Sequence, residues 1–169
     1  TPRVLVDGPT DREITKLVYD SRQVTPGSLF IALKGEKTDG AQYIPQAVEL
    51  GAEAIVSEEG IAKSRATSIV VPDARKAMAD LAAAFYERPS RYLKVAGITG
   101  TNGKTTTAFL LKQICDYALL RSGLIGTVRY QIADEVLPAG RTTPESLDVQ
   151  ELLWRMQNAG CKSVAMEVS

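Results

Sequence analysis

The segment 97–107, with the sequence GITGTNGKTTT, combines residue types that bind phosphate. Its Gly-Lys-Thr triplet matches the end of the common phosphate-binding pattern G-x-x-x-x-G-K-[ST], although the first glycine lies one position too early. Gly100 and Gly103 allow backbone amides to turn toward one point, and a helix that begins at Lys104 presents further free amides to an anion. The spacing predicts that Lys104 reaches the terminal phosphates of a nucleotide and that Thr105 presents its hydroxyl to magnesium.

A carboxylate ends a second expected strand. Glu167 lies at the end of the run SVAMEV, residues 163–168, and open α/β sheets bind ligands at the carboxyl ends of their strands. The alternatives are a solvated glutamate here and a plain strand-to-helix turn with a solvated lysine at 97–107. The two features together favour a nucleotide site at which oxygen atoms hold a magnesium ion.

The sequence contains no histidine. A Ser-His-Asp or Cys-His arrangement within this chain is therefore excluded, and so is a His-ligated metal. The two cysteines, Cys115 and Cys161, lie in periodic apolar segments. This placement predicts core thiols rather than a disulfide and fits a reducing, cytoplasmic location.

The composition is typical of a globular protein of one or two domains. The chain has 169 residues, of which 44% are hydrophobic and 24% charged, with 20 basic and 20 acidic side chains. We expect no nucleic-acid partner, because a basic excess is missing, and no membrane insertion, because no apolar run has the length of a span. The N-terminus has no apolar core of a secretory signal, so we expect none. Nothing indicates the oligomeric state, and a monomer is expected.

The elements that must position these residues alternate between strands and helices, which predicts an α/β fold. A helix capped by Asp73 is expected to end before Pro89, and the segment PSRYL at 89–93 is the expected boundary between a domain at 1–90 and a domain at 91–169. In the first domain we expect strands at 4–6, 16–19, 29–33, 54–57 and 67–71, and helices at 41–51 and 73–88.

In the second domain a buried-type strand at 94–98 runs into the loop, and a helix at 104–121 runs out of it. Thr143 and Pro144 are the expected N-cap and first residue of a further helix. We expect strands at 123–130 and 163–168, a less regular segment at 131–140 that could carry a hairpin, and a helix that ends at 158. A nucleoside-triphosphatase sheet usually has more strands, so we expect this chain to be the N-terminal portion of a longer protein.

The order of several motifs resembles the Mur ligase family. The displaced glycine of GITGTNGKTTT is a feature of that family's ATP loop, and residues 19–56 look like its uridine-nucleotide-binding domain. The blocks GLIGTVRY, RTTPESLDVQELLWRMQNAG and AMEVS look like the domain that follows. The resemblance implies a Rossmann-like uridine-nucleotide-binding domain followed by a truncated P-loop α/β domain.

Within the family, the motifs are similar to the branch that adds the third amino acid of the peptidoglycan stem. The resemblance implies that ATP phosphorylates the free carboxylate of UDP-N-acetylmuramoyl-L-alanyl-D-glutamate. The amine of a free amino acid, meso-diaminopimelate or L-lysine, then attacks the acyl phosphate. Lysine, loop amides and magnesium neutralise the charge of the transferred phosphoryl group.

The resemblance also implies roles for individual residues. Lys104 would hold the β and γ phosphates as the catalytic residue, and Thr105 and Glu167 would hold magnesium. Tyr19 and Ser21 match uridine contacts. The ATP loop residues are Gly100, Thr101, Asn102, Gly103, Lys104, Thr105 and Thr106; the muramoyl-peptide contacts are Thr142, Thr143 and Ser169; and a further nucleotide-contacting segment is Glu36, Lys37 and Thr38.

The other residues of such a ligase, including its carbamoylated lysine and its amino-acid pocket, would lie beyond this chain, so we expect the chain alone to be inactive. Other classes stay open. A Mur ligase that adds the terminal dipeptide shares the DSR and GSLFIAL segments, although the second-domain blocks argue against it. A folate-glutamate ligase, a P-loop switch or motor ATPase, and a non-catalytic binding module are further alternatives.

Overall fold

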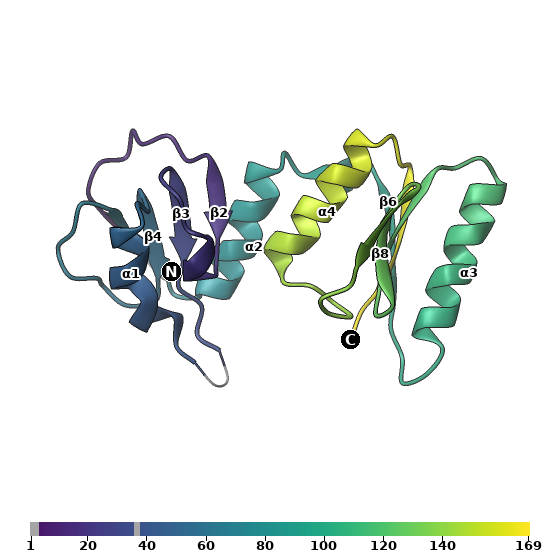
Figure 1. Ribbon diagram of the computed structural model, residues 1–169, viewed down its shortest axis with the longest axis horizontal. Coiled ribbons are helices and arrows are strands. Elements are labelled where there is room, and N and C mark those ends of the chain that lie inside the picture. Colours follow the sequence, from purple (N-terminus) through teal and green to yellow (C-terminus); the bar gives the residue numbers. More distant parts are fainter. Residues whose placement is uncertain (1–3, 36–37) are drawn as a thin grey trace. The chain divides into compact units, whose positions relative to one another are not determined.

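The computed structural model describes residues 4–35 and 38–169, which form two compact units, Thr1–Leu81 and Ala82–Ser169 (Figure 1). Each unit contains a five-stranded mixed sheet with helices, so the predicted α/β class is confirmed. The division between the units falls within helix α2 (Ala74–Phe85), a few residues before the boundary expected at 89–93. Among the described residues, no helix has both the length and the apolar character to cross a membrane.

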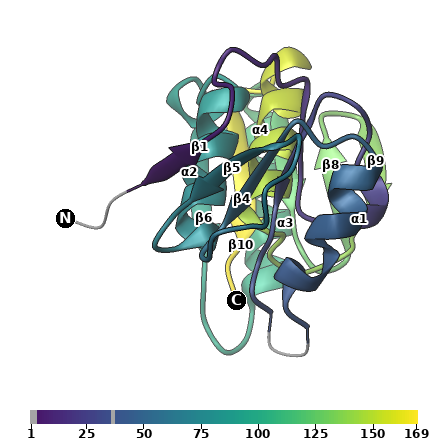
Figure 2. The same ribbon diagram turned by 90° about the vertical axis from the view of Figure 1, so that its left-hand side faces the viewer.

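The sheet of the first unit has the strand order β1-β5-β4-β3-β2, with β1 antiparallel and the other strands parallel (Figure 2). Asp73 caps α2 as predicted, because its carboxylate accepts a hydrogen bond of 2.8 Å from the Lys76 N–H. The elements are β1 (Leu5–Asp7), β2 (Lys16–Val18), the 3-10 turn η1 (Ser21–Gln23), β3 (Ser28–Ile31), the 3-10 turn η2 (Gly40–Tyr43), α1 (Ile44–Glu49), β4 (Ala54–Ser57), β5 (Thr67–Val70) and α2.

The core of the first unit lies between α1 and the sheet. Ala47 on α1 is fully buried and packs with Val18, Phe30 and Ile55 from three neighbouring strands. Val18, Phe30 and Ile55 are register partners on adjacent strands, so their side chains point to the same face of the sheet. Strands β2 to β5 are parallel, so they end at one edge of the sheet, where Tyr19 and the loop after β4 follow.

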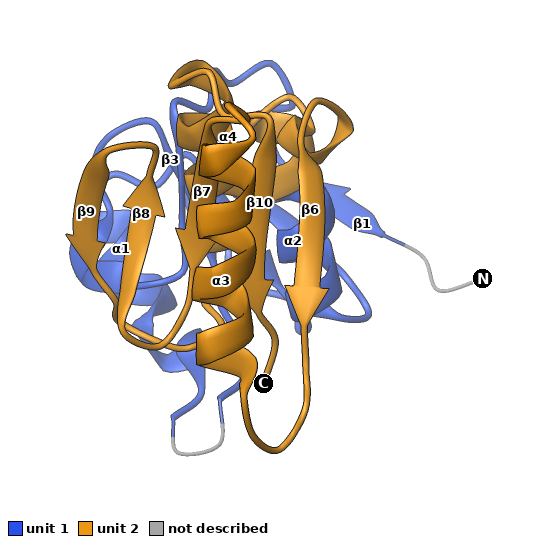
Figure 3. Ribbon diagram, turned by 90° about the vertical axis from the view of Figure 1, so that its right-hand side faces the viewer, with its two compact units in different colours: residues 1–81 blue, residues 82–169 orange. Residues whose placement is uncertain are grey.

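The sheet of the second unit has the order β6-β10-β7-β8-β9 (Figure 3). Strands β6, β10 and β7 are parallel, and Glu167 lies opposite Ile98 in this register. The chain turns back through antiparallel β8 and β9, which confirms the hairpin expected in this region. The elements are the 3-10 turn η3 (Pro89–Arg91), β6 (Lys94–Ile98), α3 (Lys104–Tyr117), β7 (Ser122–Ile125), β8 (Arg129–Ile132), β9 (Glu135–Pro138), α4 (Ser146–Asn158) and β10 (Ser163–Glu167).

Helices α3 and α4 cover opposite faces of the second sheet (Figure 1). Met156 of α4 packs with Ile125 and Val164 on one face, whereas Ala108 of α3 packs with Leu124 and Ala165 on the other. Successive residues of β7 and β10 thus point to different helices. The packing of one helix on each face of the sheet fixes the carboxyl ends of three parallel strands beside the start of α3.

Both cysteines are free thiols, and burial raises the pKa of the Cys161 thiol.

Two helices are shorter than predicted. Helix α2 ends at Phe85 rather than near residue 88, because Glu87 and Arg88 adopt left-handed backbone angles and the Arg88 N–H returns to the Ala83 carbonyl. Helix α3 ends at Tyr117 rather than near residue 121, because the backbone of Leu119 also adopts a left-handed conformation. Residues other than glycine form these caps, so the sequence carried no glycine signal at either end.

Two predictions for the second unit are wrong in detail. The expected strand at 123–130 is two antiparallel strands, β7 and β8, separated by a turn at residues 126–128. Helix α4 begins at Ser146 after Glu145, so Thr143 is not its N-cap and Pro144 is not its first residue. The Thr143 hydroxyl instead lies 3.1 Å from the Glu167 carbonyl oxygen, to which it donates a hydrogen bond across to β10.

Strand β6 is also less buried than predicted. Its sequence, KVAGI, is typical of a strand covered on both faces, yet its residues are exposed or half-buried and Val95 is 39% exposed. The reason is position: β6 is the edge of the sheet and pairs only with β10 among the described strands. The apolar character of the strand therefore does not match its surroundings in this chain.

A buried lysine is stabilised by one carboxylate on the same helix. Lys112 is 7% exposed and donates a 2.6 Å hydrogen bond to Asp116, which also accepts one from the Ser122 hydroxyl. Burial alone raises the pKa of Asp116, but the hydrogen bonds from Lys112 and Ser122 outweigh it, so its pKa is lowered overall. A lowered folded-state pKa means that the pair stabilises the fold above the ordinary value of 3.8 and loses that effect as the pH falls further.

We expect Asp116→Asn to lower the free energy of unfolding at pH 7 by about 1–3 kcal/mol, because it leaves a buried ammonium group without its charged partner. Denaturant unfolding at pH 7 measures the effect. Asp134→Asn is the matched control, since Asp134 is 96% exposed in its ion pair with Arg121 and should contribute less than about 1 kcal/mol. Equal losses in the two variants would contradict this account.

Candidate functional site

The loop between β6 and α3 has the conformation that its glycines allow. Gly100 and Gly103 have φ angles of 143° and 80°, and Gly103 is the N-cap of α3 without any side-chain capping bond. The first-turn amides of α3 are therefore left to solvent or to a ligand. The ammonium group of Lys104 donates a 2.7 Å hydrogen bond to the Gly100 carbonyl and so folds back over the loop.

Glu167, at the carboxyl end of β10, is completely buried. Its Oε2 atom accepts a hydrogen bond of 2.9 Å from the Thr105 hydroxyl. The Thr127 N–H donates to Oε1 at 3.0 Å, and the Thr127 hydroxyl lies 3.1 Å from Oε2. These donors are neutral amide and hydroxyl groups, so none of the three contacts is an ion pair that would compete with a bound cation. The structure thus brings together the two residues predicted to hold magnesium.

Gly126 and Thr127 complete this arrangement, although the sequence motifs do not mark either of them as a site residue. They follow the carboxyl end of β7, which neighbours β10 in the sheet. A Cβ atom added to Gly126 would lie 2.2 Å from Glu167 Oε1, so glycine is required for the carboxylate to occupy this place. The expected strand at 123–130 placed Thr127 within a strand, whereas β7 ends at Ile125, so Thr127 lies at the same edge of the sheet as the loop.

The three residues predicted to contact the muramoyl peptide lie beside the carboxylate. The Thr142 hydroxyl is 3.0 Å from the Thr127 hydroxyl. Thr143 is 3.0 Å from Ser169 between hydroxyl oxygens, and the Ser169 N–H donates to Thr143 Oγ1 at 2.9 Å. Their proximity is established by these contacts, whereas their role stays a proposal.

A cavity of about 320 Å³ joins these groups in the second unit, lined by Thr101, Asn102, Gly103, Lys104, Thr105, Thr106, Thr127, Thr142, Glu167 and Ser169. The donor set fits a magnesium-bound nucleotide phosphate. Magnesium is usually held by one or two carboxylates together with substrate phosphates, and no cluster of three or more acidic or thiol ligands occurs in the described ranges. Glu167 and the Thr105 hydroxyl would hold the ion, while Lys104 and the helix amides would hold phosphate oxygens.

The predicted uridine residues lie in the first unit, after the carboxyl end of β2. The Ser21 side chain is buried and its hydroxyl donates to Gln46 Oε1 on α1 at 3.0 Å. Asp20 accepts hydrogen bonds from the Arg22 guanidinium, which lowers the Asp20 pKa. Tyr19 is half-buried. Of the segment 36–38, Glu36 and Lys37 lie outside the described residues.

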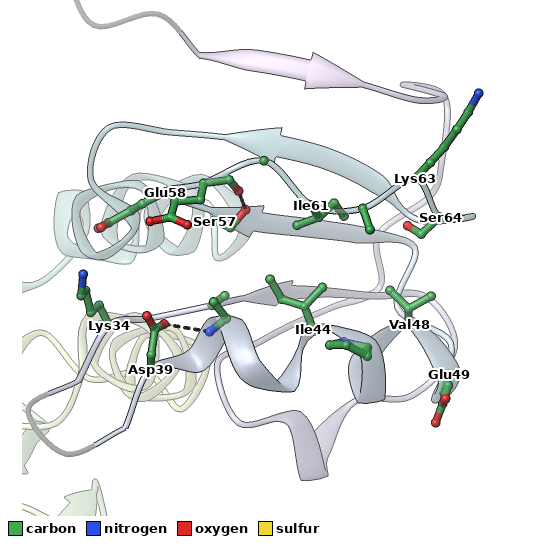
Figure 4. A pocket seen from close by; sticks show the side chains of 16 residues that line it. Lys34, Asp39, Ile44, Val48, Glu49, Ser57, Glu58, Ile61, Lys63 and Ser64 are labelled. Atoms are coloured by element: carbon green, nitrogen blue, oxygen red, sulfur yellow. Dashed lines mark hydrogen bonds between the residues drawn. The ribbon is translucent and has the colours of Figure 1, made fainter.

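A larger cavity of about 510 Å³ lies elsewhere in the first unit, between α1 and the loop after β4 (Figure 4). Ile44 and Val48 from α1 face Ile61 across it, and Lys34, Asp39 and Glu58 lie at one end. Neither Tyr19 nor Ser21 lines this cavity. The structure therefore does not bring the predicted uridine residues into this cavity.

Each unit matches a recognised protein family. Residues 13–86 match the family described as "Mur ligase family, catalytic domain", and residues 98–169 match "Mur ligase middle domain". The two matches agree in family and follow in the expected order along the chain. Together with a nucleotide-type loop beside a buried glutamate, they show that this chain belongs to the Mur ligase family.

Several curated relatives with high identity carry the same enzyme name. The chain is 46% identical over 165 residues to UDP-N-acetylmuramoyl-L-alanyl-D-glutamate–2,6-diaminopimelate ligase of Caldanaerobacter subterraneus subsp. tengcongensis, covering 97% of this chain and 34% of the relative. It is 48% identical over 168 residues to the protein of the same name from Bacteroides fragilis, covering 98% and 35%. The chain therefore spans about a third of the length of these relatives.

Solved structures with the same fold come from two branches of the family. A structure of UDP-N-acetylmuramoyl-L-alanyl-D-glutamate–2,6-diaminopimelate ligase matches with a TM-score of 0.77 at 27% identity, covering 92% of this chain and 32% of that one. MurF from Thermotoga maritima in complex with ADP matches with a TM-score of 0.61 at 25% identity, covering 94% and 33%. The higher score of the first favours the branch that the sequence motifs indicated.

Proposed function

We propose that this chain carries the uridine-nucleotide and ATP-binding parts of a ligase that joins an amino acid to UDP-N-acetylmuramoyl-L-alanyl-D-glutamate. The observation that carries the proposal is the buried Glu167 carboxylate, which bonds the Thr105 hydroxyl at the start of the phosphate-type loop. The names of the relatives favour 2,6-diaminopimelate as the amino acid. The proposed location of the enzyme is the cytoplasm.

The chemistry assigned to this site is transfer of a phosphoryl group to a carboxylate, followed by attack of an amine on the acyl phosphate. Lys104 would release the Gly100 carbonyl and bind phosphate oxygens, and the amides of the first turn of α3 would hold others. Magnesium, when bound, supplies further positive charge to the transferring group. Thr142, Thr143 and Ser169, at the same edge, would orient the carboxylate of the muramoyl peptide.

Calorimetric titration with UDP-N-acetylmuramoyl-L-alanyl-D-glutamate tests the substrate assignment, with plain UDP and the tripeptide-carrying nucleotide as comparisons. We expect the dipeptide nucleotide to bind more tightly than either. Binding of plain UDP with equal strength would leave the family in place and contradict the proposed branch. If none of the three binds, the uridine assignment in the first unit is wrong.

Ser21→Ala is expected to weaken binding of the uridine nucleotide about 3–10-fold, as the loss of one hydroxyl contact of roughly 0.5–1.5 kcal/mol predicts. The matched control is Ser64→Ala, because Ser64 lines the larger cavity of the same unit and bonds only locally, to Ala66. If Ser64→Ala weakens binding and Ser21→Ala does not, the nucleotide occupies the larger cavity and the assignment of Ser21 is wrong.

A further inference from the structure

Thr127 links the Glu167 carboxylate to the Thr142 hydroxyl. Its hydroxyl lies 3.1 Å from Glu167 Oε2 and 3.0 Å from the Thr142 hydroxyl, and its N–H donates to Glu167 Oε1. Thr127 thus contacts both oxygens of the Glu167 carboxylate, one with its N–H group and one with its hydroxyl. The same side chain lines the cavity beside the start of α3.

The direction of these hydrogen bonds follows from the protons that are available. An ionised carboxylate can only accept, and each threonine hydroxyl has one proton to give. The Thr127 hydroxyl is placed to donate either to Glu167 Oε2 or to Thr142 Oγ1, and its single proton serves one of them at a time. Thr127 therefore connects Glu167 to Thr142, and the Thr105 hydroxyl donates to the same Glu167 oxygen.

The position of Thr127 argues against a purely structural role. The residue is exposed and follows the carboxyl end of β7, outside the apolar cores of the second unit. Its neighbour Gly126 carries the steric requirement, because only glycine leaves room for Glu167 Oε1. A donor that fixes the orientation of a metal ligand strongly affects metal affinity.

We propose that Thr127 is a positioning residue that orients the Glu167 carboxylate for a divalent cation and connects it to Thr142. This inference rests on the proposed nucleotide site. It assigns Thr127 no contact with the substrate or with the transferred phosphoryl group. The role needs the hydroxyl, since the N–H bond to Oε1 is made by the backbone and remains in any substitution other than proline.

Thr127→Val removes the hydroxyl and keeps the branched shape, while Thr127→Ser restores the hydroxyl without the methyl group. The measurement is calorimetric titration of the chain with ADP at a series of free Mg²⁺ concentrations, which gives the Mg²⁺ concentration for half-maximal binding. We expect Thr127→Val to raise this concentration about 10–100-fold, as loss of an outer partner of a metal ligand does. Thr127→Ser should return it close to the wild-type value.

Two further readouts separate positioning from structure. Affinity for ADP without Mg²⁺ should stay unchanged in Thr127→Val, whereas a purely structural role would weaken it as well. Thr142→Val, which removes a contact one step further from the carboxylate, should raise the Mg²⁺ requirement less than Thr127→Val does.

The possible outcomes separate a failure of the Thr127 role from a failure of the proposed function. If the wild-type chain binds ADP independently of Mg²⁺, or does not bind ADP, both the nucleotide–magnesium site and the role of Thr127 are overturned. If ADP binding depends on Mg²⁺ in the wild-type chain and depends on it equally in Thr127→Val, only the role of Thr127 is overturned. A Thr127→Ser variant as impaired as Thr127→Val also overturns it, because shape rather than the hydroxyl would then matter.

Discussion

Lys104→Ala is expected to weaken ADP binding by this chain about 10–100-fold. The ammonium group of Lys104 bonds the Gly100 carbonyl in the structure and can exchange that partner for a phosphate oxygen. A hydrogen bond to a charged group contributes roughly 1.5–3 kcal/mol, which corresponds to this range of affinities. Titration calorimetry with ADP and Mg²⁺ measures the loss, and binding of the uridine nucleotide by the first unit should be retained.

Lys94→Ala is the matched control for this prediction. Lys94 is exposed and begins β6, the strand that runs into the loop, so it lies at the opposite end of that strand. Its removal changes the net charge by the same amount and should leave ADP affinity nearly unchanged. Equal loss in both variants would mean that Lys104 acts only through general charge, which would contradict the loop assignment.

Gly126→Ala is expected to displace the Glu167 carboxylate directly. The new Cβ would lie 2.2 Å from Glu167 Oε1, so the carboxylate must move or β7 must shift. We expect the Mg²⁺ requirement for ADP binding to rise about 10-fold or more, because the orientation of a metal ligand is lost. A loss of about 1–3 kcal/mol in the free energy of unfolding should accompany it.

Gly140→Ala is the control, because an added Cβ there meets nothing within 4 Å. It should leave both the Mg²⁺ dependence and the unfolding free energy close to wild type. A Gly126→Ala variant that is destabilised but keeps the wild-type Mg²⁺ dependence would show that Glu167 does not ligate the ion.

The loop and its carboxylate could be predicted from the sequence because both signals are local. The spacing of Gly103, Lys104 and Thr105 after an apolar run specifies a strand, a loop and a helix start, and the structure has β6 and α3 in those places. Glu167 could be found for the same reason, as the last residue of a short strand. Glu167 and Thr105 are 62 residues apart in the sequence. Their contact follows from the general rule that parallel strands have their carboxyl ends at one edge of the sheet.

The role of Thr127 could not be predicted in the same way. It depends on β7 being the neighbour of β10, and the sequence alone does not give the order of strands in the sheet. The burial of β6 was misjudged for a related reason, since burial is a property of the neighbours that a strand has. Thr143 has the residue type of a helix cap, but its hydroxyl bonds β10 and Ser169 instead, so a tertiary contact outweighs the local preference.

The central claim is that Thr105 and Glu167 hold a divalent cation next to nucleotide phosphates bound by the loop. A crystal structure of this chain with ADP and Mn²⁺, in which anomalous scattering locates the ion, tests it most directly. We predict the anomalous peak between Thr105 Oγ1 and the Glu167 carboxylate, with the β-phosphate at the first turn of α3 beside Lys104. Ion and nucleotide density at any other place, with the cavity beside Glu167 left to solvent, would contradict the account.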